Sequence, residues 1–209
     1  MKLRFLMVLT NLIVIFTLVS TGGAAVIMSN LSPGDTYNNF IGYVILGSSY
    51  GTNSRSAASS FTTGTSNWDF DSAELALRFT GGSNSFSVNI LVDADGKPGT
   101  LLQSTSLSGI QTEPGLITIT PNSPISLEAN KTYWIALFGN DNSGCEWYLG
   151  LDGTSSGSSL ANGVWTQNPG VPAFRINGTQ TITPIPEPNS IAGFFIITFY
   201  LLKRRNRHL

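Results

Sequence analysis

Histidine, cysteine and charge are all scarce in this sequence of 209 residues. The only histidine is His208, so the segment from residue 26 to residue 185 contains no imidazole. This excludes from that segment the Ser-His-Asp and Cys-His mechanisms and metal sites built on histidine ligands. The only cysteine, Cys145, leaves no partner for an intrachain disulfide and no thiolate set for zinc. We therefore expect a protein that is not an enzyme and carries no cofactor, with calcium as the one open alternative discussed below.

Charged residues make up 11% of the chain, against about 25% in a typical soluble domain. They are also segregated, because the two ends are basic and the middle is acidic. Residues 26–185 carry five basic and eleven acidic side chains, a net charge of −6. Binding to a phosphate backbone needs clustered lysine and arginine, so we expect no nucleic-acid partner.

The first apolar run, residues 5–19, follows Lys2 and Arg4 and precedes a stretch of small residues. This order is typical of a secretory signal peptide. We expect residues 1–25 to be the signal peptide, cleaved near Ala24 or Ala25. An uncleaved membrane helix is the alternative, although spanning takes about 20 apolar residues. In both cases the following domain is exported through the inner membrane.

Between residues 35 and 183 apolar and polar side chains alternate with a period near two. Gly, Pro, Asn or Asp interrupts the alternation about every ten residues, which is typical of strands joined by turns. The pattern predicts an all-β fold, an antiparallel β-sandwich (jelly-roll-like or Ig-like), over residues 26–180. The expected core residues are Phe61, Leu75, Leu77, Phe86, Val88, Ile90, Leu101, Ile117, Tyr133, Trp134, Ile135, Leu137 and Phe174.

The stretch DADGKPG, residues 93–99, resembles part of a calcium loop. It fails as an EF-hand, because Lys97 and Ser104 stand where liganding residues would be needed. Asp95-Gly96 is an ordinary turn signal, so we expect a structural hairpin turn here. Asp93 and Asp95 stay candidates for a calcium site of another kind.

Two further hypotheses concern sugars. Trp147 and Trp165 border polar, glycine-rich segments, so we expect exposed rings that could stack on a saccharide. Trp134 lies in an apolar strand and is expected in the core. A pair of carboxylates could also support glycoside hydrolysis if two of them lay about 5 to 10 Å apart. The sequence does not say which acidic residues would meet this condition.

The second apolar run, residues 191–202, lies close to the C-terminus. As a helix it would span roughly 18 Å, against about 30 Å for the bilayer core. Residues 181–188 form a proline-rich stalk before it, and residues 189–209 form a transmembrane-like tail with a basic end. The expected sorting motif is Pro186, Glu187 and Pro188, and the basic cluster is Lys203, Arg204, Arg205 and Arg207.

This order of triplet, apolar run and basic cluster resembles the PEP-CTERM sorting signal. The resemblance implies a bacterial protein whose tail enters the membrane transiently and is processed by an exosortase-like enzyme. A plain tail anchor without processing is the alternative.

Three ordered stretches of the middle segment resemble the choice-of-anchor R domains. They are AASSFTTG (57–64), FSVNILVDADGKPGTLL (86–102) and SLEANKTYWIALFG (126–139). The resemblance implies a secreted β-sandwich attached to a sorting tail, and it implies no catalytic residues.

The sequence therefore predicts a non-catalytic bacterial protein of the outer surface or extracellular matrix. It is expected to associate with exopolysaccharide or biofilm. A carbohydrate-binding module, a two-carboxylate glycoside-active enzyme and a calcium-dependent adhesin are the alternatives.

Overall fold

The computed structural model describes residues 23–50, 53–152, 155–161 and 163–181. These ranges contain thirteen β-strands and no helix, and every strand pairing in them is antiparallel. The expectation of an all-β antiparallel fold is therefore confirmed. Within the same ranges no helix is long and apolar enough to span a membrane. Residues 1–22 of the expected signal peptide, the sorting motif and the basic cluster lie outside the described residues, whereas Ala25, the last residue of the expected signal peptide, begins β1.

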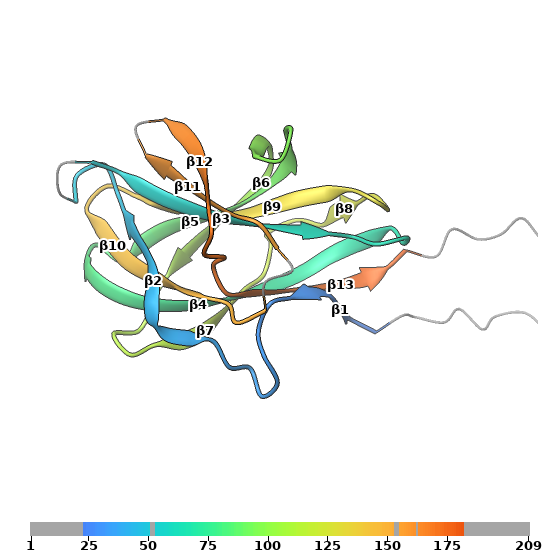
Figure 1. Cartoon of the computed structure of the whole chain (residues 1–209), viewed down its shortest axis with the longest axis horizontal. Helices are drawn as coiled ribbons and strands as arrows, with labels where there is room; N and C mark the ends of the chain where they lie inside the picture. Colours follow the sequence, from blue (N-terminus) through green and yellow to red (C-terminus); the bar gives the residue numbers. More distant parts are fainter. Residues whose placement is uncertain (1–22, 51–52, 153–154, 162, 182–209) are drawn as a thin grey trace, which may run out of the picture.

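The first arm of the sheet is built around β4 (Trp68–Gly82) (Figure 1). Leu75 of β4 pairs with both Phe174 and Ile117, so β13 and β7 lie on opposite edges of β4. One edge of β4 carries β13 (Phe174–Gln180) and β10 (Ser143–Leu149), and the other carries β7 (Gly115–Ile119) and β8 (Ile125–Leu127). The outer strands of this arm are β1 (Ala25–Ser29), paired with β13, and β2 (Asn38–Leu46), paired with β10.

The second arm is built around β9 (Thr132–Gly139), whose β-branched and aromatic residues suit a strand. β9 pairs with β3 (Arg55–Thr62) and β5 (Ser85–Asp93). The remaining strands extend this arm on both sides. β6 (Pro98–Ser108) pairs with β5, while β11 (Gly157–Ala161) pairs with β3 and with β12 (Val164–Asn168).

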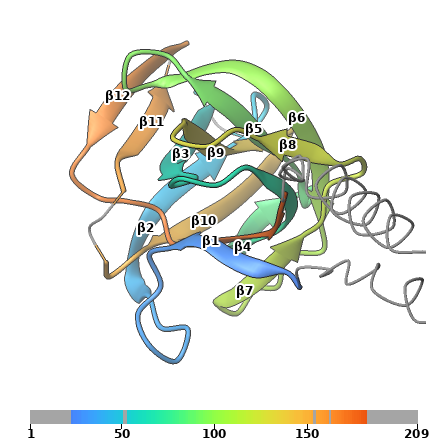
Figure 2. The same cartoon turned by 90° about the vertical axis from the view of Figure 1, so that its right-hand side faces the viewer.

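The two arms belong to one sheet that curves into a half-barrel (Figure 2). Among the described residues, β2 and β3 pair through Leu46 and Arg55 alone. Backbone pairing therefore contributes little to holding the arms together at this corner.

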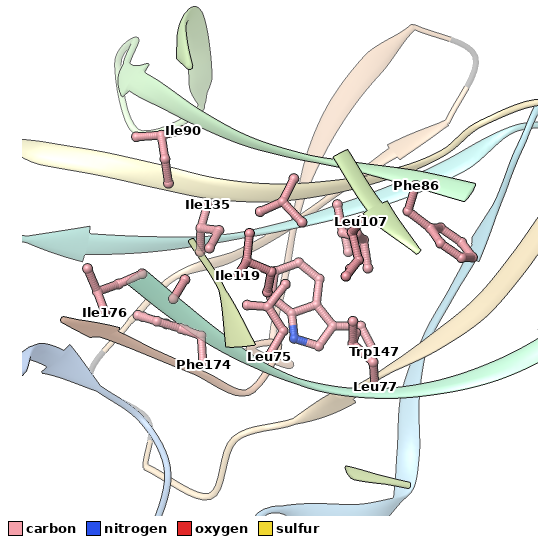
Figure 3. Packing of buried hydrophobic residues seen from close by; sticks show 14 of the residues in the cluster. Leu75, Leu77, Phe86, Ile90, Leu107, Ile119, Ile135, Trp147, Phe174 and Ile176 are labelled. Atoms are coloured by element: carbon pink, nitrogen blue, oxygen red, sulfur yellow. The ribbon is translucent and has the colours of Figure 1, made fainter. Parts of the chain in front are cut away.

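The main hydrophobic core lies between the arms and takes side chains from both. Leu75, Trp147 and Phe174 come from the first arm, and Phe86 and Ile135 come from the second. Figure 3 shows these side chains directed toward one another. Each of these five side chains has no exposed surface. Burial of apolar surface is the main favourable term in folding, so this core is what unites the arms.

Eleven of the thirteen expected core residues are buried. Ile117 is half-buried and packs against the core from β7. Leu101 was wrongly expected in the core, because its side chain is 50% exposed. It lies on β6 beside a β-bulge, which changes the face to which the neighbouring side chains point.

Candidate functional site

A pocket of about 490 Å³ opens between the β5–β6 pair and the turn from β8 to β9. Val92, Leu102 and Tyr133 form its apolar side, and Val92 and Tyr133 also contact the main core. The polar residues that complete the lining are Asp93, Ser126, Glu128, Asn130, Lys131 and Thr132. We call these nine residues the β8–β9 pocket. Its volume lies within the range of small-ligand sites, about 300 to 1,000 Å³, and its lining holds more polar than apolar residues.

Two irregularities in the pairing of β5 with β6 lie beside the pocket. Ile90 pairs with Gln103 and Leu91 pairs with Leu101, so Leu102 is an extra residue without a partner in β5. Such bulges redirect a side chain and occur often next to functional sites. Here Leu102 lines the pocket, whereas its neighbour Leu101 does not.

Thr63, which follows β3, holds the turn at the pocket rim. Its hydroxyl donates to the Glu128 carbonyl at 2.6 Å and accepts from the Lys131 amide at 3.2 Å. Its own backbone amide donates to the Lys131 carbonyl. The Glu128 amide donates to the Tyr133 hydroxyl at 2.9 Å. The backbone of the rim is thus fixed from two sides.

Asn130, at the tip of this turn, has a φ of 56°. This left-handed conformation is easiest for glycine, asparagine and aspartate. The Asn130 amide donates to the carbonyl of Gly64, whose φ is 62°. Asparagine and glycine, which tolerate a positive φ, therefore occupy the two turns that meet at this hydrogen bond.

The three quoted stretches of sequence meet at this end of the domain. The first supplies Thr63 and Gly64, the second supplies Asp93 and Leu102, and the third supplies the turn from Glu128 to Lys131. The second and third stretches are also joined by the indole of Trp134, which donates to Asp93 Oδ1 at 2.7 Å. Sequence spacing alone gave no reason to place them around one pocket.

Asp93 has both carboxylate oxygens in hydrogen bonds to the protein. Oδ1 accepts from Trp134, and Oδ2 accepts from the Gly96 amide at 3.1 Å. Asp95 is exposed and has a φ of 53°, as expected for a turn residue. In the described ranges no group of three or more His, Cys, Asp or Glu side chains is placed to hold a metal ion. The geometry supports the hairpin-turn role of Asp93 and Asp95 and adds nothing in favour of calcium.

No family model matches this chain, and no curated protein matches it. Among solved structures it is similar to the cysteine protease and lectin-like domains of Cwp84, a surface layer associated protein of Clostridium difficile. The identity is 15% and the TM-score is 0.45, over 62% of this chain and 33% of that chain. The chain thus spans about one third of that structure.

Trp147 was wrongly expected to be exposed. Its ring lies in the main core without exposed surface, and its indole donates to the Ala173 carbonyl at 2.8 Å. A buried ring has no face to offer a ligand. Trp165 is half-buried and packs edge-on against Phe138, with ring centroids 6.1 Å apart at 83°. Neither tryptophan lines the β8–β9 pocket.

Cys145 offers no reactive thiol. Its side chain is buried, and burial raises the pKa of the thiol, with the Glu146 carboxylate raising it further. Glu146 in turn forms an ion pair of 2.9 Å with Arg78. The thiolate, which is the nucleophilic form, is therefore disfavoured.

Sequence reasoning missed most of the pocket lining, namely Val92, Leu102, Ser126, Asn130, Lys131 and Thr132. One signal was available in the third stretch. Asparagine at Asn130, between Ala129 and Lys131, marks a turn that tolerates positive φ.

Proposed function

We propose that this chain is an exported, non-catalytic bacterial protein of the outer surface or extracellular matrix. A PEP-CTERM tail sorts it, an exosortase-like enzyme processes that tail, and the exported domain associates with exopolysaccharide. The observation that supports the proposal is the all-β domain in the middle of the chain. Strands β1 to β13 run from Ala25 to Gln180, in the segment where the sequence predicts the exported domain.

The pairing of the first and last strands supports the same proposal. Ala25 pairs with Gly178, so the start of β1 and the end of β13 lie side by side (Figure 1). A domain attached through either end would present the same remaining surface. This arrangement suits a domain that is attached to the membrane first through its signal peptide and later through its sorting tail.

We also propose that the half-barrel belongs to the β-sandwich class. Its two arms pack face to face over one core, and a single residue pair joins them at the corner of β2 and β3. That is close to two packed sheets, the arrangement that defines a sandwich.

The intact mass of the protein purified from its bacterial host tests the sorting proposal. The expected mass starts near Ala25 and lacks residues 189–209. Glu187→Ala should leave the tail attached, because the triplet is what the processing enzyme recognises. Pro184→Ala changes another residue of the stalk and should leave processing intact. A wild-type protein that retains residues 189–209 would contradict the proposal.

A further inference from the structure

We infer that the β8–β9 pocket binds one sugar unit that carries no carboxylate, phosphate or sulfate. The inference rests on the proposed association with polysaccharide and names the site and the class of sugar. A sugar ring has an apolar face of C–H groups and a rim of hydroxyls. The pocket has the complementary arrangement, with Val92, Leu102 and Tyr133 on one side and six polar residues around them.

The rim has hydrogen-bonding groups available for such a ligand. Among the described residues, the side chains of Glu128, Asn130, Lys131 and Thr132 form no hydrogen bond or ion pair with the protein. Together they offer an ammonium donor, a carboxylate acceptor and two groups that both donate and accept. Sugar hydroxyls also donate and accept at once, so they can satisfy all four.

The charge of the pocket selects against anionic sugars. Asp93 and Glu128 contribute two negative charges, and Lys131 contributes one positive charge. The domain as a whole carries a net charge of −6 between residues 26 and 185. Negative charges on both the protein and its ligand lower the affinity and slow the association. An uncharged sugar or an amino sugar therefore fits, and a uronate does not.

The backbone around the pocket is built to hold its shape without a ligand. The bulge places Leu102 in the pocket lining, Thr63 fixes the rim through three hydrogen bonds, and Asn130 takes a positive φ at the tip. A site fixed before binding loses less conformational freedom when the ligand enters.

Calorimetry on the exported protein, as purified from its bacterial host, tests the inference. The probes are cellohexaose as the neutral sugar, a chitosan hexamer as the amino sugar and hexagalacturonate as the anionic one. We expect binding of at least one of the first two, and at least tenfold weaker binding of hexagalacturonate. Tightest binding of hexagalacturonate would overturn the inference, as would the absence of binding to all three.

A matched pair of variants ties binding to the pocket. Leu101 and Leu102 are adjacent on β6 and are 50% and 43% exposed, yet only Leu102 lines the pocket. We expect Leu102→Asp to weaken binding at least tenfold and Leu101→Asp to change it less than twofold. Asn130→Gly keeps the backbone conformation and should weaken binding several-fold with an unchanged thermal midpoint. Equal effects of Leu101→Asp and Leu102→Asp would overturn the inference.

The two proposals fail in different ways. Loss of pocket binding with a correctly processed mass would remove the sugar site and leave the sorting proposal standing. A retained tail together with pocket-dependent binding would contradict the sorting proposal and leave the sugar site standing. Release of shorter oligosaccharides from any probe would contradict the non-catalytic assignment.

Discussion

Asn30 connects the segment after β1 to the strand that closes the domain. Its side chain is fully buried, although amides are rarely found inside without partners. The amide nitrogen donates to the Pro172 carbonyl at 2.9 Å, and the amide oxygen accepts from the Phe174 backbone at 2.7 Å. One side chain thus satisfies two backbone groups at the start of β13.

We predict that Asn30→Ala lowers the free energy of unfolding by about 1 to 3 kcal/mol. The substitution leaves the buried Phe174 amide without a partner, whereas the Pro172 carbonyl keeps the hydrogen bond from the Ser59 hydroxyl at 2.9 Å. Urea denaturation followed by circular dichroism measures the change. Asn39→Ala is the matched control, because Asn39 is exposed and should matter by less than about 0.5 kcal/mol. Similar losses for the two variants would contradict the role given to Asn30.

Cys145 makes the stability of the domain depend on pH in the alkaline range. Burial raises the pKa of its thiol, and Glu146 raises it further. In the unfolded chain a thiol titrates near about 8.5. Above that pH the unfolded chain has released a proton that the folded protein keeps, so the free energy of unfolding falls as pH rises. The contribution is fully present below about pH 8.5 and is lost progressively toward the higher pKa of the folded state.

The predicted decrease in the free energy of unfolding from Cys145 is about 1 to 1.3 kcal/mol per pH unit between about pH 9 and pH 10. Urea denaturation at several pH values in this range measures it. Cys145→Ala removes the titrating group, so its stability should fall less steeply with pH, whatever its stability at neutral pH. An identical slope in the two proteins would contradict the assignment.

At the scale of elements, the β11–β12 hairpin lies against the outside of the second arm. Ala58, Leu91, Trp134 and Ala136 form a small buried cluster there, and Trp165 of β12 packs against it. The Gln167 side chain donates to the Gly96 carbonyl in the β5–β6 turn at 3.1 Å. The hairpin therefore contacts the second arm through the Trp165 ring and the Gln167 side chain, in addition to the pairing of β11 with β3.

We predict that Trp165→Ala costs about 1 to 2 kcal/mol of stability without changing oligosaccharide binding. The ring loses its edge-on contact with Phe138 and part of its buried area. Thermal denaturation and calorimetry give the two readouts. Val164→Ala, next to it and 63% exposed, serves as the control and should be close to neutral. Weaker oligosaccharide binding by Trp165→Ala alone would favour Trp165 as a ligand residue.

At the scale of the whole molecule, the period-two pattern predicted the all-β class and most of the core. The polar, glycine-rich segments beside Trp147 suggested that its ring would be exposed. Burial there depends on the opposing arm, which supplies Phe86 and Ile135 to the same core. The prediction for Leu101 was wrong for a local reason, because a regular alternation of apolar and polar residues does not reveal a bulge in β6.

The pocket could not be predicted from the sequence for a related reason. Its lining comes from residue 92 to residue 133, and Thr63 supports it from another strand. Strand pairing brings these positions together. Local sequence patterns do not determine which distant strands pair with each other. The turn at Asn130 was readable, whereas its position beside Leu102 was not.

The shared core also predicts how the molecule unfolds. Leu75 lies in the first arm and Phe86 in the second, and both are fully buried in the same cluster. Leu75→Ala and Phe86→Ala should each cost about 2 to 5 kcal/mol. If the core couples the arms, either substitution destabilises the whole domain, because small domains unfold as single cooperative units.

Cys145 supplies a single labelling site, since it is the only cysteine of the chain; it lies on β10 of the first arm, and its side chain is buried in the main core. Pulsed thiol labelling in urea reports its exposure, and circular dichroism reports the loss of strands throughout the domain. We expect the two midpoints to coincide in the wild type and to shift together in both variants. Phe86→Ala is the informative case, because its cavity lies in the arm that does not contain Cys145. Labelling of Cys145 at an unchanged urea concentration in Phe86→Ala would show that the arms unfold separately and that the core between them is weaker than its burial indicates.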